Sequence, residues 1–332
     1  MRKFSLALLL LLIFIFVFAR TAELEAIGRT LQNGDWRYLL LALLLEVVWL
    51  FNVAISYWLI YRSIGLNEKI DTLFLASSGA YFANVIAPTA GASGLAVFIT
   101  TARRRGYSTA RATIAGALYI LFDYLGFIFI LALGLIVLFR RNNLNIPELV
   151  ASAVLFLIAG LWLFLLFLGM RSGKALGNTL AWFARQINRL VAPFIRREYF
   201  SEARARAFAY EASTGLKELR QKPGDLMLPA ILAVTNKALL ILILLLMFKA
   251  FQVPLSIGTL IASFSIGYLF LIVSPTPAGI GMVEGALTLA LSSMYVPLGV
   301  AAVVALAYRA ITFWVPLAFG GLALRLLDHQ TA

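Results

Sequence analysis

The chain alternates between long apolar stretches and short polar connections. Apolar stretches cover Phe4–Ala19, Tyr38–Tyr61, Ala112–Phe139, Leu149–Met170, Leu226–Phe248 and Pro297–Leu324. Each is close to or longer than the ~20 residues that a helix needs to cross a bilayer. With 62% hydrophobic and only 13% charged residues, the composition excludes a soluble protein of this length. The sequence therefore predicts an all-α polytopic membrane protein with about six transmembrane spans.

Two further apolar segments are interrupted by proline and glycine, at residues 79–94 and 267–281. Thr72–Leu73 and Thr259–Leu260 precede them at a common offset of about 187 residues, which relates a first half at roughly residues 39–138 to a second at 226–325. Paired, broken segments in matching halves of a membrane protein are typical of a transport site.

The boundaries of these patterns predict six regions. The N-terminus begins with Arg2-Lys3 and an apolar run, which is typical of a signal peptide or signal anchor, and the length of the run favours a retained anchor. The regions are a signal anchor and external loop (1–37), a first membrane repeat (38–140), a connecting span (141–170), a basic amphipathic loop (171–225), a second membrane repeat (226–325) and a tail (326–332).

Basic residues assign sides to the loops. Arg2, Lys3, Arg103–Arg105 and the 171–225 stretch are expected in the cytoplasm by the positive-inside rule, whereas Arg140-Arg141 is a contrary signal on the outside. The first broken segment must then enter and leave on the cytoplasmic side, as a re-entrant hairpin with its tip at residues 88–94. The second, at about 258–296, enters from outside with its tip at 275–281. We therefore predict an inverted repeat whose two tips meet near the midplane.

The 171–225 stretch carries eleven Lys or Arg residues against five acidic ones. Its apolar positions recur at helical spacing, at Leu176, Leu180, Phe183, Ile187 and Leu190. Two interpretations stay open: a helix that lies on anionic lipid headgroups, or a helix packed beneath the bundle. Because the basic residues flank apolar spans, the net charge of +13 indicates topology and lipid affinity, with no nucleic-acid partner.

Five ionisable residues lie inside apolar segments, where each costs at least ~2.5 kcal/mol at the bilayer centre unless paired or hydrated. Helical rise brings Asp123 and Arg309 to mid-depth at equivalent repeat positions, so we expect them to be partners. The pair is either a structural ion pair or a site where Arg309 binds a phosphate that Asp123 holds in place. Glu46 and Lys237 form a second candidate charge pair.

At the second tip, Pro275 and Pro277 stop a helix, and Gly279 and Gly281 expose backbone N–H groups before a new helix begins. A helix N-terminus at membrane depth attracts anions. Glu284 has two interpretations there: it caps the free N–H groups, or it meets a cationic headgroup or carries a proton.

The sequence contains few residues that could carry out thiol chemistry or bind a metal. The chain has no cysteine and one histidine, His329, near its end. We therefore expect no disulfide, no metal and no cofactor.

The segment Ser274-Pro-Thr-Pro-Ala-Gly-Ile-Gly-Met-Val-Glu-Gly285, followed by Tyr308-Arg309, resembles the membrane region of lysylphosphatidylglycerol synthases, a flippase-like family. Residues 88–94 look like its first-half counterpart. The resemblance implies a membrane region that flips lipids, while a separate soluble domain, which these 332 residues are not expected to include, makes the aminoacylated lipid. The substrate-binding residues that the resemblance implies are Pro88, Gly91, Gly94, Pro275, Gly279, Gly281, Glu284 and Arg309. Asp123 joins them from its depth in the span, as the residue that holds the phosphate in place.

The leading hypothesis is a lipid flippase of the cell membrane that binds a phospholipid or polyprenyl headgroup between the two tips. It is expected not to be an enzyme. One alternative is a membrane-embedded transferase acting on a lipid carrier, with Asp123 and Glu284 as acid and base. The other is an accessory subunit of a separate lipid synthase.

Overall fold

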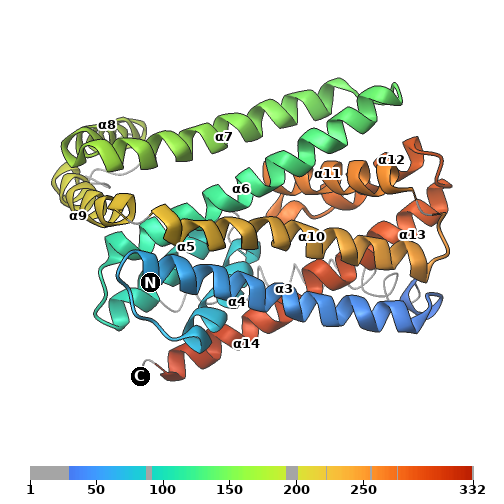
Figure 1. Cartoon of the computed structure of the whole chain (residues 1–332), viewed down its shortest axis with the longest axis horizontal. Helices are drawn as coiled ribbons and strands as arrows, with labels where there is room; N and C mark the ends of the chain where they lie inside the picture. Colours follow the sequence, from blue (N-terminus) through green and yellow to red (C-terminus); the bar gives the residue numbers. More distant parts are fainter. Residues whose placement is uncertain are drawn as a thin grey trace.

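The computed structural model describes residues 30–86, 92–191, 201–221, 223–254, 256–274 and 276–330, and within these ranges the chain forms helices and no strand (Figure 1). Five elements are long and apolar enough to cross a membrane. They are α3 (Trp36–Ser63), α6 (Thr109–Arg140), α7 (Ile146–Arg171), α10 (Met227–Ala250) with the preceding turn η1 (Pro223–Leu226), and the rod formed by α13 (Leu298–Arg309), η3 (Ala310–Trp314) and α14 (Val315–Gln330). The predicted N-terminal anchor, Phe4–Ala19, lies outside the described residues.

Two helical hairpins separate these spans. The first is α4 (Ile70–Ile86) with α5 (Ala92–Arg104), and the second is α11 (Ile257–Val273) with α12 (Met282–Ser293), joined by the turn η2 (Pro277–Gly279). The 13 residues of α5 and the 12 of α12 rise about 20 Å at most, less than the ~30 Å hydrocarbon core. Each hairpin therefore turns back inside the molecule, as the Pro/Gly breaks predict.

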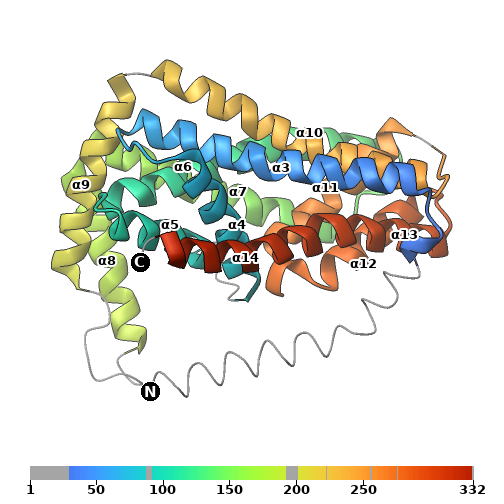
Figure 2. The same ribbon diagram turned by 90° about the horizontal axis from the view of Figure 1, so that it is seen from below.

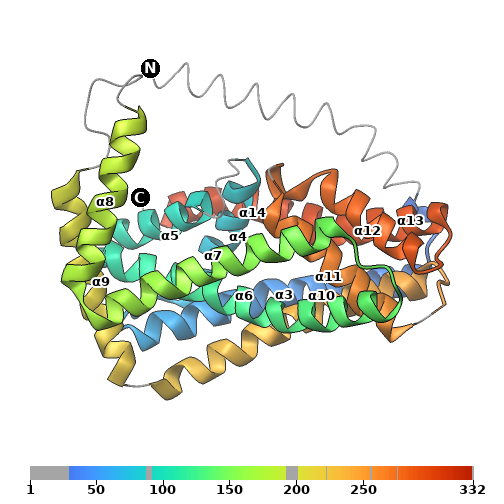
Figure 3. The ribbon, with the colours of Figure 1, turned by 90° about the horizontal axis from the view of Figure 1, so that it is seen from above.

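The two hairpins enter from opposite ends of the molecule. In Figures 1 and 3, α5 lies toward the end that carries α8 (Gly173–Val191) and α9 (Glu202–Gln221), whereas α11 and α12 lie toward the other end. Both α4 and α11 have 17 residues, and their bounds differ by the predicted 187 positions. The predicted inverted pair of re-entrant hairpins is thus confirmed. We call the end with α8, α9 and Arg103–Arg105 the basic end.

Capping side chains fix where the helices begin. Ser108 Oγ accepts from the Arg111 N–H at 3.1 Å at the start of α6, and Ser256 Oγ accepts from Thr259 at the start of α11. Arg141, expected on the outer side despite its charge, donates to Thr259 Oγ1 at 3.1 Å and to Ser256 Oγ at 3.2 Å. Arg141 therefore holds the start of α11 in place. This role explains why a basic residue lies at the end of the molecule that faces away from the basic end.

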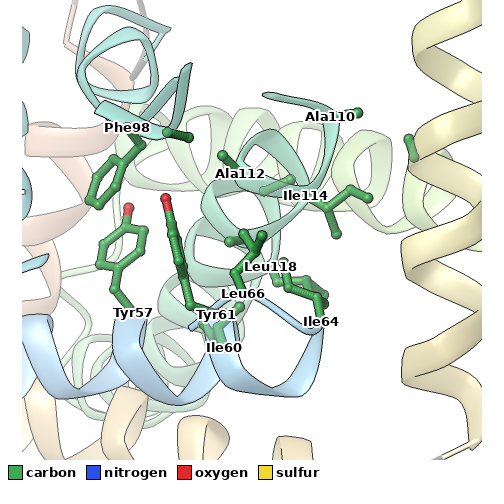
Figure 4. Close-up of a cluster of buried hydrophobic side chains, with 14 of the residues drawn as sticks. Tyr57, Ile60, Tyr61, Ile64, Leu66, Phe98, Ala110, Ala112, Ile114 and Leu118 are labelled. Atoms are coloured by element: carbon green, nitrogen blue, oxygen red, sulfur yellow. The ribbon is translucent and has the colours of Figure 1, made fainter. Parts of the chain in front are cut away.

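The spans pack closely across the repeat boundary: α3 lies against α10, and α14 lies against α4, as the view from below shows (Figure 2). Gly320 makes the second contact close, because a Cβ there would collide with the Ser78 carbonyl oxygen. Near the basic end, Tyr57 stacks on Phe98 with ring centroids 4.1 Å apart (Figure 4). The opposite face of Tyr57 stacks on Tyr119 at 4.2 Å, which links this core to the polar interior.

The basic 171–225 stretch contains two packed helices, α8 and α9. Two interpretations were open for this stretch, a helix on the lipid headgroups and a helix packed beneath the bundle, and each describes one part of α8. Leu176 is buried in the core at the basic end, whereas Trp182, Phe183 and Ile187 are exposed farther along the helix. The apolar face of α8 is therefore partly packed and partly presented to the surroundings.

Candidate functional site

A polar cavity of about 250 Å³ lies where the two hairpins approach each other. Both halves of the chain line it, with residues from α3, α4 and α6 on one side and from α10 to α13 on the other. Its polar lining consists of Tyr81, Asn84, Tyr119, Asp123, Tyr268, Tyr308, Arg309 and Thr312, together with the indole of Trp49. The predicted site residues Asp123 and Arg309 therefore meet at one cavity.

The Asp123 carboxylate on α6 is held by groups from the second half. Lys237 Nζ lies 2.5 Å from Asp123 Oδ1, and the Tyr268 hydroxyl donates to Oδ2 at 3.0 Å. The Lys237 side chain is 0% exposed and its ammonium also donates to the Tyr268 hydroxyl. A buried ion pair of this kind needs such extra hydrogen bonds to offset its desolvation.

The second ion pair joins Arg309 to the tip of the second hairpin. Arg309 Nε donates to Glu284 Oε1 at 2.9 Å, and Nη2 donates to the Ala278 carbonyl at 2.9 Å. Ala278, Gly279 and Gly281 have φ of 48°, 70° and 79°, so the tip uses left-handed backbone that favours glycine. Arg309 thus ties the long rod to the tip loop.

Glu284 also caps the helix that follows the tip. Its Oε2 accepts from the Gly281 N–H at 2.7 Å, at the start of α12. The capping interpretation of Glu284 is therefore observed, and its other oxygen meets a cation of the protein itself. One carboxylate satisfies both the helix N-terminus and the guanidinium.

The first tip uses a neutral cap in the matching place. Asn84 Oδ1 accepts from the Gly94 N–H at 2.7 Å and from Ser93 Oγ at 2.9 Å at the start of α5. Gly94 packs directly against this cap, because a Cβ at this position would collide with the Asn84 amide. The predicted tip residues Pro88, Gly91 and Pro275 lie outside the described residues. Charge at the described tip positions is thus confined to the second hairpin.

Both predicted charge pairings are wrong. Asp123 pairs with Lys237 rather than Arg309, and Arg309 pairs with Glu284. The repeat places Asp123 and Arg309 at equivalent positions, but equal depth does not make two residues lateral neighbours: α6 packs on α10, and α13 packs on α12. Glu46 does not pair with Lys237, and neither of its buried carboxyl oxygens has a hydrogen-bond partner within the described residues.

Tyr81, Tyr119 and Tyr268 line the cavity and were not predicted from the sequence, and two of them hold groups of the other half or of a later helix. Tyr268 orients Asp123, and Tyr81 donates to the Thr312 carbonyl at 3.1 Å. They lie 187 positions apart, so the repeat offset was the signal that would have found them. The Thr312 carbonyl belongs to η3, a π-helical turn that directly follows Arg309. Such turns are frequent at functional sites.

A groove runs along the second helix of each hairpin. The groove beside α5 and α14 has a volume of about 290 Å³, and the groove beside α12 and the end of α6 has about 770 Å³. An offset of 189 positions, two more than the 187 that relates α4 to α11, brings every α5 residue that lines the first groove onto an α12 residue that lines the second. They are Ser93, Ala96, Val97, Thr100, Thr101 and Arg104, matched by Met282, Gly285, Ala286, Leu289, Ala290 and Ser293. The repeat therefore relates two grooves that lead from the tips toward opposite ends.

These features define a multi-pass integral membrane protein whose two inverted halves enclose a polar cavity, with broken helices at its centre. The family model described as the lysylphosphatidylglycerol synthase TM region matches residues 4–320, and the chain belongs to this family. No curated protein gives a significant match to the chain. The protein is therefore an integral membrane protein of lipid metabolism or transport.

Proposed function

We propose that the protein moves a lipid headgroup between the two leaflets of the cell membrane. The observation that carries this proposal is the polar cavity between opposed hairpin tips, with repeat-related grooves extending toward each end. A headgroup would travel along the grooves and cavity while its acyl chains stay in the bilayer. Thr100 and Leu289, at equivalent places in the two grooves, are both exposed, which supports entry from the surrounding lipid.

Arg309 is the proposed headgroup ligand. Its Nε and Nη2 are engaged, but Nη1 makes no hydrogen bond within the described part of the chain. A phosphate oxygen would accept from Nη1 and compete with Glu284 for the guanidinium, because phosphate and carboxylate share the same fork geometry. Asp123 is already bonded by Lys237 and Tyr268, so we assign it to positioning these groups.

The positive-inside rule favours a cytoplasmic location for the basic end, and the basic pair Arg2-Lys3 favours the same side for the N-terminus. The cytoplasmic groove would then be the one beside α5, whose outer end carries Arg104. The opposite groove contains Glu148 and two asparagines. A basic cytoplasmic groove favours entry of an anionic headgroup from that leaflet.

The test is movement of fluorescent phosphatidylglycerol and phosphatidylcholine across proteoliposomes that contain the purified chain. We expect movement with the unmodified protein and its loss in Arg309→Gln and Glu284→Gln. Arg325→Gln, which removes an exposed cation on α14, is the matched control and should move lipid normally. Equal movement in all four proteins would refute the assignment of Arg309 and Glu284.

Two alternatives predict different results. A lipid-carrier transferase would form product from purified protein and lipid, but the carboxylates available as its acid and base, Asp123 and Glu284, both hold protein cations, which favours transport. An accessory subunit would move no lipid alone and would co-purify with a separate lipid synthase. Movement by the isolated chain without product formation distinguishes our proposal from both.

A further inference from the structure

A second cavity lies between α8 and α9 at the basic end and has a volume of about 500 Å³. It shares no lining residue with the polar cavity between the hairpins. Among the described side chains, its lining contains four cations and no carboxylate: Arg171 at the end of α7, Lys174 in the first turn of α8, and Arg206 and Lys217 on α9. Four like charges around one cavity repel each other unless an anion lies among them.

These four cations form few ion pairs with the described residues. In the described ranges, Arg171, Lys174 and Lys217 form no ion pair, and Arg206 has one long contact of 3.5 Å with Glu202. The Arg206 side chain is exposed and the Glu202 side chain is partly exposed, so the contact contributes little. The positive potential of the cavity is therefore available to a ligand.

The wall of the cavity holds an unused hydroxyl. Ser213 lines the cavity and is 3% exposed, and its Oγ has no hydrogen-bond partner among the described residues. A buried polar group without a partner is uncommon in folded proteins and requires an explanation. A ligand oxygen that accepts from Ser213 supplies one.

The start of α8 faces the same hydroxyl. Gly173 is the first residue of α8, and a Cβ there would lie 3.1 Å from Ser213 Oγ, so the glycine keeps this approach open. The first N–H groups of a helix have no intrahelical acceptor and carry partial positive charge. Ser172 Oγ accepts from the Ala175 N–H at 3.2 Å, which leaves the N–H groups of Gly173 and Lys174 without an acceptor among the described residues and open to a ligand.

We propose that this cavity binds the phosphate group of an anionic ligand. Cationic side chains, a helix N-terminus and a buried hydroxyl together match a group that carries one to two negative charges on several acceptor oxygens. The ligand is either an anionic phospholipid headgroup or a soluble phosphate ester. Trp182 and Phe183, exposed farther along α8, would lie in the same leaflet as such a lipid.

The first experiment uses the full chain in nanodiscs of phosphatidylcholine and measures pyrophosphate binding by isothermal titration calorimetry. Loss of a charge-assisted hydrogen bond should weaken binding about tenfold in Lys174→Gln and in Ser213→Ala. Ser213→Ala is decisive because it changes no charge and removes an unsatisfied hydroxyl, so folding is preserved. Arg204→Gln removes an exposed cation of α9 that does not line the cavity and should bind normally.

The second experiment distinguishes the source of the phosphate. Detergent-purified protein is offered equal amounts of phosphatidylglycerol and phosphatidylcholine, and retained lipids are counted by native mass spectrometry. Selective retention of phosphatidylglycerol that Ser213→Ala and Lys174→Gln abolish assigns the site to a lipid headgroup. Pyrophosphate binding that depends on these residues without such retention assigns it to a soluble phosphate ester.

The proposal is overturned if neither pyrophosphate affinity nor phosphatidylglycerol retention distinguishes Ser213→Ala and Lys174→Gln from Arg204→Gln. Absence of binding in both experiments overturns it equally. These outcomes are independent of lipid movement, because the cavity lies apart from the proposed transport site.

Discussion

Arg309 and Glu284 join the long α13–α14 rod to the tip of the second hairpin through a contact of 2.9 Å. The same carboxylate caps α12 through the Gly281 N–H at 2.7 Å. One side chain therefore sets the shape of the tip and the position of the guanidinium that lines the polar cavity. A ligand that draws Arg309 away from Glu284 would loosen the tip at the same time. Ligand binding would therefore be coupled to the conformation of the second hairpin tip.

This coupling predicts a specific double-mutant result. Arg309→Gln should lower the free energy of unfolding by about 3 kcal/mol, because it leaves a mostly buried carboxylate without its cation. Glu284→Gln added to it should recover part of the loss, since the amide oxygen still caps α12 and no charge remains. Denaturant titration in detergent measures both values. Strictly additive losses would show that the two residues do not interact.

The Asp123–Lys237 pair predicts a larger effect. Lys237→Met should cost about 3–5 kcal/mol of stability, because the Asp123 carboxylate stays buried without its cation. Changing both partners, in Asp123→Leu/Lys237→Met, should restore most of it. Lys249→Met on the same helix removes an exposed lysine and serves as the control. A double variant as unstable as the single one would mean that the pair is needed for folding itself.

For Glu46 we expect the opposite effect, a substitution that increases stability. Its carboxyl group is 0% exposed and lacks a donor within the described residues, so burial of the group costs stability. Glu46→Met should raise the free energy of unfolding by about 1–3 kcal/mol. If lipid movement falls in the same variant, the carboxyl serves transport at the expense of stability. A less stable variant would contradict the absence of a partner.

Local sequence signals predicted the hairpins but not the partners of the charged residues. Pro and Gly breaks, a fixed repeat offset and basic loops are properties of short segments, so the hairpins and their opposite entry could be read from them. The partner of Asp123 depends on which helices are lateral neighbours, and hydropathy contains no such information. The same limit applied to α8, whose periodicity predicted a helix but not that Leu176 packs while Ile187 is exposed.

Sidedness can be tested directly because the chain has no cysteine. Arg103→Cys lies at the basic end and Arg140→Cys at the opposite end, and both side chains are exposed. In oriented vesicles, a membrane-impermeant maleimide should label them from opposite sides, with Arg103 reached from the cytoplasm. Labelling of both from one side is incompatible with the arrangement described above.

The repeat-related grooves predict equivalent effects from substitutions on opposite sides of the membrane. Ala96 and Gly285 occupy matching positions 189 residues apart, each lining one groove. A Cβ at Gly285 meets no atom within 4 Å, and Ala96 is exposed, so a phenylalanine fits at either place and fills the groove without disturbing the fold. Ala96→Phe and Gly285→Phe should each slow lipid movement several-fold while the free energy of unfolding stays within about 0.5 kcal/mol of the parent value.

The matched control is Gly160→Phe on α7, where a Cβ also meets open space but the residue lines neither of the two grooves. It should move lipid at the parent rate. If only one of the two groove variants slows movement, lipid enters the cavity from one leaflet alone. If neither does, the headgroup travels by a route other than these grooves, while the polar cavity and its ion pairs remain to be tested by Arg309→Gln.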